Sequence, residues 1–175
     1  VSSSVGRARY GSANAAEVEA QTRRLYESGE LRDWAQETFL DENGDKKDGL
    51  ELNELEDRAI RHYNDGFTDK GDIKRVMKLE DKMRKELHGS LPESERDDET
   101  KIRQANERAR VMSETIGKIA KDITPGKLSD KKYREGKLEE FAKGIEKSNP
   151  DLSQGEVKAN ASQMMDYVMQ YYKKP

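Results

Sequence analysis

The sequence predicts an all-α protein, and three features of the chain predict it. Apolar residues recur three and four positions apart over most of its length, which places them on one face of a helix. The alternation of apolar and polar residues that is typical of a half-buried strand never extends over more than a few positions. Glycine, proline and capping residues divide the chain into seven periodic segments. We expect roughly 60–70 % helix and at most a two-stranded ribbon between Leu50 and Ile73.

The composition limits the size of the core and the kinds of chemistry. Charged residues make up 39 % of the 175 residues, and Leu, Ile, Val and Phe together number 29, which is low for a packed globule. The 33 basic residues nearly balance the 36 acidic ones, so the high net charge typical of disordered chains is missing. The chain has no Cys, which excludes disulfide scaffolds, zinc–thiolate sites and thiol catalysis. No apolar run approaches the ~20 residues that span a bilayer, so no membrane partner is expected.

Three regions follow from the pattern. Residues 1–12 are rich in Ser, Gly and Arg and lack periodicity, so they are predicted to form a flexible arm. Residues 13–89 are predicted to form a subdomain of short helices around an acidic loop. Residues 90–175 are predicted to form a bundle of three longer helices, because short connections between long helices make neighbours antiparallel.

The first two helices of the 13–89 region are separated by a glycine. Ser12 or Asn14 can cap a helix that runs to Ser28, where Gly29 stops it. A second helix is expected over residues 30–40. Its apolar face comprises Leu31, Trp34, Ala35 and Phe39.

The third and fourth helices complete that region. Asn53 and Glu56 have the spacing of a capping box, so the third helix is expected to start near Asn53. The fourth helix ends at Gly89. The apolar positions of the two helices are Leu55, Ala59, Tyr63, Ile73, Val76, Met77, Met83 and Leu87.

The clearest regularity of the chain lies in its fifth helix, which is expected to open at Ser90 with Glu93 as its capping partner. Apolar residues follow one another three and four positions apart in a heptad stripe that Pro125 ends. The stripe consists of Ile102, Ala105, Ala109, Met112, Ile116, Ile119 and Ile123.

Two further helices follow the heptad stripe. The sixth is expected over residues 129–147, and Pro150 separates it from the last, which begins with the capping box of Ser153 and Glu156. The residues expected to be buried are Leu138, Phe141, Ala142 and Ile145 in the sixth helix, and Val157, Ala161, Met164, Val168 and Tyr171 in the last.

The turn between the second and third helices carries the one chemical motif of the chain. Asp41, Asn43 and Asp45 occupy alternate positions, so their oxygens can converge from one tight turn, and Glu54 follows on the next helix. Calcium takes about six to eight oxygen ligands from such flexible loops. These four residues are therefore the candidate metal ligands, with calcium as the cofactor.

Residues 31–63 resemble an EF-hand, with a helix, a loop that begins Asp-x-Asn-x-Asp, an aliphatic residue, a closing Glu and a second helix. The usual loop has about twelve residues, whereas Glu54 is the fourteenth counted from Asp41. Lys46 and Lys47 lie inside the loop and repel a dication.

EF-hands come in pairs, so the resemblance implies that Leu50 pairs with Ile73 of a second turn over residues 64–71. That second turn has Met77 where a closing Glu would stand, and we expect it to be metal-free. The alternative to calcium binding is a polar turn in which Asp, Asn and Gly serve turn geometry and capping.

Other function classes find little support in the sequence. His62 and His88 lie near helix ends among charged residues and are expected at the surface, and no nucleophile-elbow or phosphate-loop pattern occurs, so no enzyme is predicted. Basic and acidic residues are interspersed, which argues against a nucleic-acid partner. The Tyr- and Met-rich residues 164–172 are either core or a docking surface for a protein partner.

Two functions remain open at this point. The first is a non-enzymatic helical protein that binds calcium through its EF-hand-like loop and engages a protein partner. The second is a structural or assembly protein, such as a virion component, a secreted effector or a secretion adaptor, in which the loop is only a turn. A calcium titration separates the two.

Overall fold

The structure is a computed structural model, and it describes residues 15–173. It is 77 % helical, and residues 15–173 contain no strand, so the all-α prediction is confirmed. The predicted arm and the predicted caps of the first helix, Ser12 and Asn14, lie outside the described residues. The helices are α2 (Ala15–Ser28), α3 (Glu30–Thr38), α4 (Gly49–Asn64), α5 (Lys70–Gly89), α6 (Glu99–Ala120), α7 (Lys131–Ser148) and α8 (Gln154–Tyr171), with two 3₁₀ helices, η1 (Glu93–Glu95) and η2 (Pro125–Lys127).

The chain divides into two compact units, residues 1–77 and 78–175, and the division falls inside α5. The sequence placed this boundary after Gly89, where a charged stretch begins. Helix α5 continues through the division without a glycine or proline in its central turns, so no local signal marks the place where the contacts of one unit end.

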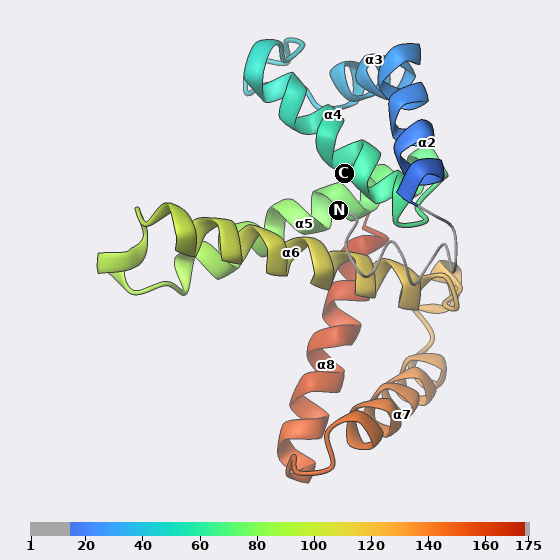
Figure 1. Cartoon of the computed structure of the whole chain (residues 1–175). Helices are drawn as coiled ribbons and strands as arrows, with labels where there is room; N and C mark the ends of the chain where they lie inside the picture. The colour runs from blue at the N-terminus through green and yellow to red at the C-terminus, as the bar shows by residue number, and fades with distance from the viewer. Residues whose placement is uncertain (1–14, 174–175) are drawn as a thin grey trace. The chain divides into compact units, whose positions relative to one another are not determined.

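In the N-terminal unit, α2, α3 and α4 pack against one another (Figure 1). Gly29 has a φ of 67°, a left-handed conformation that glycine adopts readily, and it joins α2 to α3 as expected. The core comprises Leu31, Ala35, Leu52, Leu55, Ala59, Ile60, Phe67, Ile73, Val76 and Met77.

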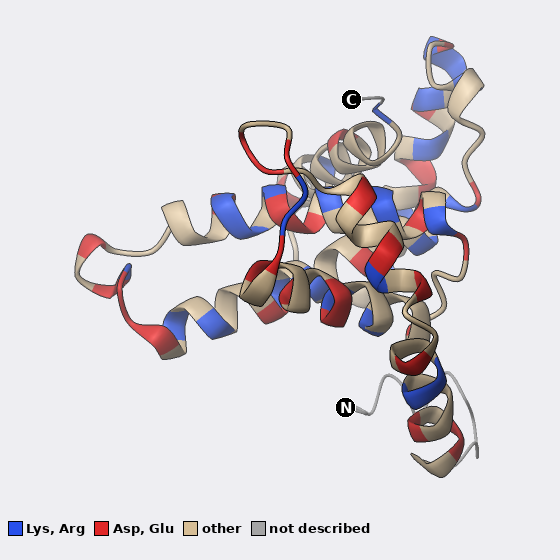
Figure 2. Ribbon diagram, turned by 90° about the horizontal axis from the view of Figure 1, so that it is seen from above, with Lys and Arg blue, Asp and Glu red and all other residues tan. Residues whose placement is uncertain are grey.

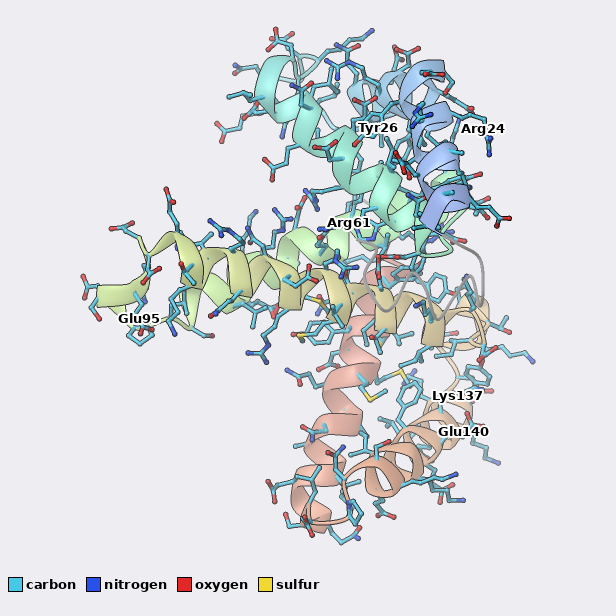
Figure 3. All side chains as sticks on the ribbon, in the orientation of Figure 1. Arg24, Tyr26, Arg61, Glu95, Lys137 and Glu140 are labelled. Atoms are coloured by element: carbon cyan, nitrogen blue, oxygen red, sulfur yellow. The ribbon has the colours of Figure 1, made fainter. Side chains whose placement is uncertain are left out.

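Helix α2 has no fully buried residue, and side-chain hydrogen bonds join it to α4. The Tyr26 hydroxyl donates a hydrogen bond to the Asp57 carboxylate, and Asn64 donates to the Thr22 hydroxyl at 2.8 Å. Tyr26 points from the end of α2 toward α4 (Figure 3).

Helix α4 begins at Gly49, with Asp48 as its N-cap, so the predicted start near Asn53 is wrong. The Asn53 side chain does not cap the helix but accepts a hydrogen bond from Arg32 at 2.9 Å. The ribbon between Leu50 and Ile73 is also wrong, because Leu50 lies in α4 and Ile73 in α5. The isolated bridge that does form joins Leu40 to Lys46.

In the C-terminal unit, α8 packs against both α6 and α7 (Figure 1). Of the seven residues of the heptad stripe, Ala105, Ala109 and Ile116 are buried in α6 and Ile123 is buried just beyond its end, while Ile102, Met112 and Ile119 are half-buried. The Tyr167 hydroxyl of α8 also donates a hydrogen bond to Glu86 at the end of α5, at 2.9 Å.

The helix starts of this unit follow side-chain caps. The Asp98 carboxylate accepts hydrogen bonds from two backbone N–H groups, so α6 begins at Glu99 and not at Ser90 as predicted. Five acidic residues lie between positions 93 and 99, and only a 3₁₀ turn forms before Asp98. The capping box of Ser153 and Glu156 is confirmed, with both reciprocal hydrogen bonds present.

A buried ion cluster lies on α6 beside the heptad stripe. Arg110 is 6 % exposed and donates to both oxygens of Glu107, at 2.9 and 2.7 Å, and to Glu114 at 3.3 Å. The apolar pattern did not identify this face, because charged residues occupy its buried positions. Elsewhere basic and acidic side chains are interspersed along the helices (Figure 2), which matches the expected solvated faces.

Candidate functional site

The loop between α3 and α4 is a tight turn closed by backbone hydrogen bonds. The N–H of Asp41 donates to the carbonyl of Asp45 at 2.9 Å, and the N–H of Gly44 donates to the carbonyl of Asp41 at 3.0 Å. Gly44 has a φ of 80°, which residues with a Cβ adopt only under strain. These local hydrogen bonds and the conformation of Gly44 build the turn.

Two charged contacts fix the conformation of the loop. One oxygen of the Asp41 carboxylate accepts hydrogen bonds from the backbone N–H groups of Asn43, at 2.8 Å, and Asp45, at 2.9 Å. The Lys46 ammonium donates to the Glu37 carboxylate at 2.9 Å. This hydrogen bond raises the pKa of Lys46 and lowers the pKa of Glu37. The Asp41 carboxylate thus stabilises the turn through its two backbone hydrogen bonds.

The structure places the four predicted ligands on two separate elements. Asp41, Asn43 and Asp45 share the turn, where the side chains of Asn43 and Asp45 are exposed, while Glu54 is exposed on α4. Within residues 15–173, no group of three or more His, Cys, Asp or Glu side chains lies together as metal ligands would. The turn that the sequence predicts is present, but the Glu54 carboxylate, which was predicted to close the site, does not form a ligand group with the residues of the turn.

Replacement of Asp41 by Ala tests the role of this carboxylate in the turn. Loss of its two backbone hydrogen bonds is expected to speed amide hydrogen exchange at Asn43 and Asp45, because each such bond contributes about 1 kcal/mol. Exposed Glu42→Ala is the matched control. Unchanged exchange in Asp41→Ala would contradict the turn-building role.

The second predicted turn is part of the core. Asp65 and Phe67 are buried, and the Phe67 ring meets the ring of His62 edge-on, with centroids 6.2 Å apart. His62 is completely buried, so its predicted surface position is wrong. The signal was present, because His62 continues the buried spacing of Leu55 and Ala59 on α4. His88 is exposed as expected, with its Nε2 2.9 Å from the carbonyl oxygen of Arg96.

A groove that sequence reasoning missed lies in the C-terminal unit. Its volume is about 420 Å³, and its walls come from the end of α6, from α7 and from α8. The apolar lining residues are Ile119, Ile123, Phe141, Gly144, Ile145 and Met164, and the polar ones are Asp122, Lys137, Glu140, Ser148 and Asn149. We call this feature the α6–α7 groove.

The α6–α7 groove leaves core-type residues partly uncovered. Ile119, Ile145 and Met164 each belong to a stripe that predicted burial, yet all three are half-buried. In α7 the same holds for Leu138 and Ala142, and of the four residues predicted to be buried there only Phe141 is. The reason is geometric: α6 and α7 both pack on α8 but make few contacts with each other.

The polar rim of the groove carries more negative than positive charge. The Lys137 ammonium lies 3.1 Å from the Glu140 carboxylate, and both side chains project from the same side of α7 (Figure 3). This hydrogen bond raises the pKa of Lys137, with further contributions from Glu140 and Asp122. The carboxylates of Glu140 and Asp122 therefore both act on the single ammonium group of Lys137.

Gly144 lies in the interior of α7, where no contact among the described residues requires glycine. A Cβ added to it would meet nothing within 4 Å. Interior glycine costs a helix about 1 kcal/mol relative to alanine. Gly144→Ala is therefore expected to raise the thermal midpoint of the chain, measured by circular dichroism. A lowered midpoint would show that this position is not open.

The Tyr- and Met-rich end of α8 is mostly core. Met165, Tyr167 and Tyr171 are buried, whereas Met169 is 45 % exposed and Met164 lines the groove. The Tyr172 hydroxyl donates to the carbonyl of Ala120 and so ties the end of α8 to the end of α6. Of the two interpretations of residues 164–172, packing accounts for most of the segment.

Comparisons with known proteins assign this chain to no family. No helix among residues 15–173 is long and apolar enough to cross a membrane. No protein-family model, curated protein or solved structure matches this chain.

Proposed function

We propose that this chain is a non-enzymatic helical protein that engages a protein partner through the α6–α7 groove. The observation that supports this most is the convergence of Ile119, Ile145 and Met164, from three different helices, on one open groove. Each residue has the helical periodicity of a core residue, and none is fully covered by the rest of residues 15–173. A partner that covers them removes apolar surface from water, which is worth about 25 cal/mol per Å².

The size of the groove suits this role. Its volume of about 420 Å³ gives room for a few apolar side chains of a partner rather than for a whole helix. A groove between two helices that share a third as their base resembles an incomplete four-helix bundle. An amphipathic helix laid into such a groove can supply the missing apolar contacts.

A displayed library of amphipathic helical peptides tests the proposal on the full chain. We expect peptides selected on the native chain to lose binding to Gly144→Trp, because the indole fills the groove. Gly136→Trp is the matched control: it lies on the same helix, also has open space around its Cβ, and does not line the groove. Selected peptides that bind Gly144→Trp undiminished would refute the proposal.

Calcium binding by the 41–49 loop is the second candidate function. The observation in its favour is that Asp41, Asn43 and Asp45 alternate on one turn between two helices, with two of the three side chains exposed. Both backbone hydrogen bonds of the Asp41 carboxylate go to one of its oxygens, so its second oxygen can serve as a ligand. The affinity is expected to be modest, on the order of 10⁻⁵ to 10⁻³ M, because Lys46 and Lys47 oppose the dication.

Calorimetry with calcium decides this second function. Millimolar calcium is expected to give binding heat and to raise the melting temperature of the chain by mass action, and Asp41→Ala is expected to abolish both effects. Magnesium serves as the control ion, since it tolerates irregular oxygen cages poorly. No heat and an unchanged melt would leave the loop as a turn, and the assembly function without metal would remain.

A further inference from the structure

We propose that the occupant of the α6–α7 groove is an amphipathic helix of a partner protein that carries a basic residue beside Asp122. This inference rests on the proposed function and names the chemistry of the partner. It follows from the shape of the groove, from its apolar lining and from the charges on its rim.

The apolar lining fits side chains spaced along one helix face. Ile119 on α6, Ile145 on α7 and Met164 on α8 present three separate half-buried contacts around one groove. A helix presents apolar residues at positions i, i+3 or i+4, and i+7 along one stripe. Gly144 leaves the wall of α7 open, since among residues 15–173 no atom beyond its chain neighbours and the nearby helix backbone lies within 4 Å of its missing Cβ. A partner side chain can therefore approach the α7 backbone closely there.

The charges at one end of the groove favour a cation. Among the lining residues, Asp122 and Glu140 are acidic and Lys137 is basic, which leaves one surplus negative charge. Lys137 is hydrogen-bonded to Glu140 at 3.1 Å and is attracted to Asp122 only at longer range, so Asp122 is the lining carboxylate on which a partner cation can act.

Two synthetic peptides test the inference on the full chain. Both are capped helices of about 16 residues, roughly four turns, with leucine at i, i+4 and i+7. One carries lysine beside the leucine stripe, and the other carries glutamate at the same place. We expect the lysine peptide to bind about three- to five-fold more tightly, the range of an exposed ion pair. Raised salt should reduce the difference, and Asp122→Lys should reverse the preference.

The variants separate failure of this inference from failure of the proposed function. Equal affinities for the two peptides, with both lost in Gly144→Trp and retained in Gly136→Trp, would overturn the basic residue but leave groove binding intact. No binding of either peptide, or binding that Gly144→Trp does not weaken, would overturn both. A dimer of the chain that dissociates in Gly144→Trp would make a second copy the occupant and would also overturn the inference.

Discussion

Ile116→Asp is expected to unfold the C-terminal unit at room temperature or to lower its thermal midpoint severely. Ile116 is 5 % exposed in the middle of the heptad stripe. An unpaired carboxylate at a buried position costs several kcal/mol, which is a large fraction of the 5–15 kcal/mol that typically stabilises a domain. The measurement is a thermal melt of the full chain, followed by circular dichroism.

Thr115→Asp is the matched control, since Thr115 is the neighbouring residue and is exposed on the same helix. It is expected to change the midpoint little, because surface substitutions usually stay within about 0.5 kcal/mol. Equal midpoints for the two variants would mean that the stripe of α6 is not the core seam.

Arg110→Ala is expected to destabilise the chain by about 3–5 kcal/mol, because removal of one partner leaves buried Glu114 with less compensation. Lys131→Ala, which breaks the exposed pair with Glu135 on α7, is expected to cost under about 1 kcal/mol. Chemical denaturation of both variants gives the two free energies. Similar losses of unfolding free energy in the two variants would show that burial does not increase the contribution of the Arg110 ion pairs to stability.

Glu107 shows how the structure changes an expectation drawn from spacing. It lies off the apolar stripe, so the sequence predicts that Glu107→Ala changes little. In the structure its carboxylate accepts two hydrogen bonds from buried Arg110. Removal of a partner from a buried charged group costs about 1–3 kcal/mol or more, and the substitution is now expected to destabilise the chain measurably.

The helices were predictable because their signals are local. Gly29 and the capping box of Ser153 and Glu156 mark helix ends through contacts within a few residues, and both hold in the structure. The start of α4 was missed because Asn53, which has capping spacing, bonds instead to Arg32 of another helix. The division into compact units falls inside continuous α5 and depends on tertiary contacts, so no local sequence signal marks it.

The candidate sites divide in the same way. The turn around Asp41 could be predicted, since Asp, Asn and Gly at those positions fold back locally. Whether Glu54 reaches that turn depends on where α4 begins, and spacing alone misplaced that start. The α6–α7 groove had no sequence signal, because Ile119 and Ile145 have the same periodic spacing as buried core residues. Only the separation of α6 from α7 leaves them uncovered.

The most direct test of groove binding is a methyl NMR titration of the full chain with the lysine peptide. Ile119, Ile123 and Ile145 line the groove, whereas Ile60 and Ile73 are buried in the N-terminal unit. The account predicts saturable shifts of the Ile119 and Ile145 methyl signals, with those of Ile60 and Ile73 unchanged. Shifts confined to other isoleucines, or no shifts at saturating peptide, would contradict it.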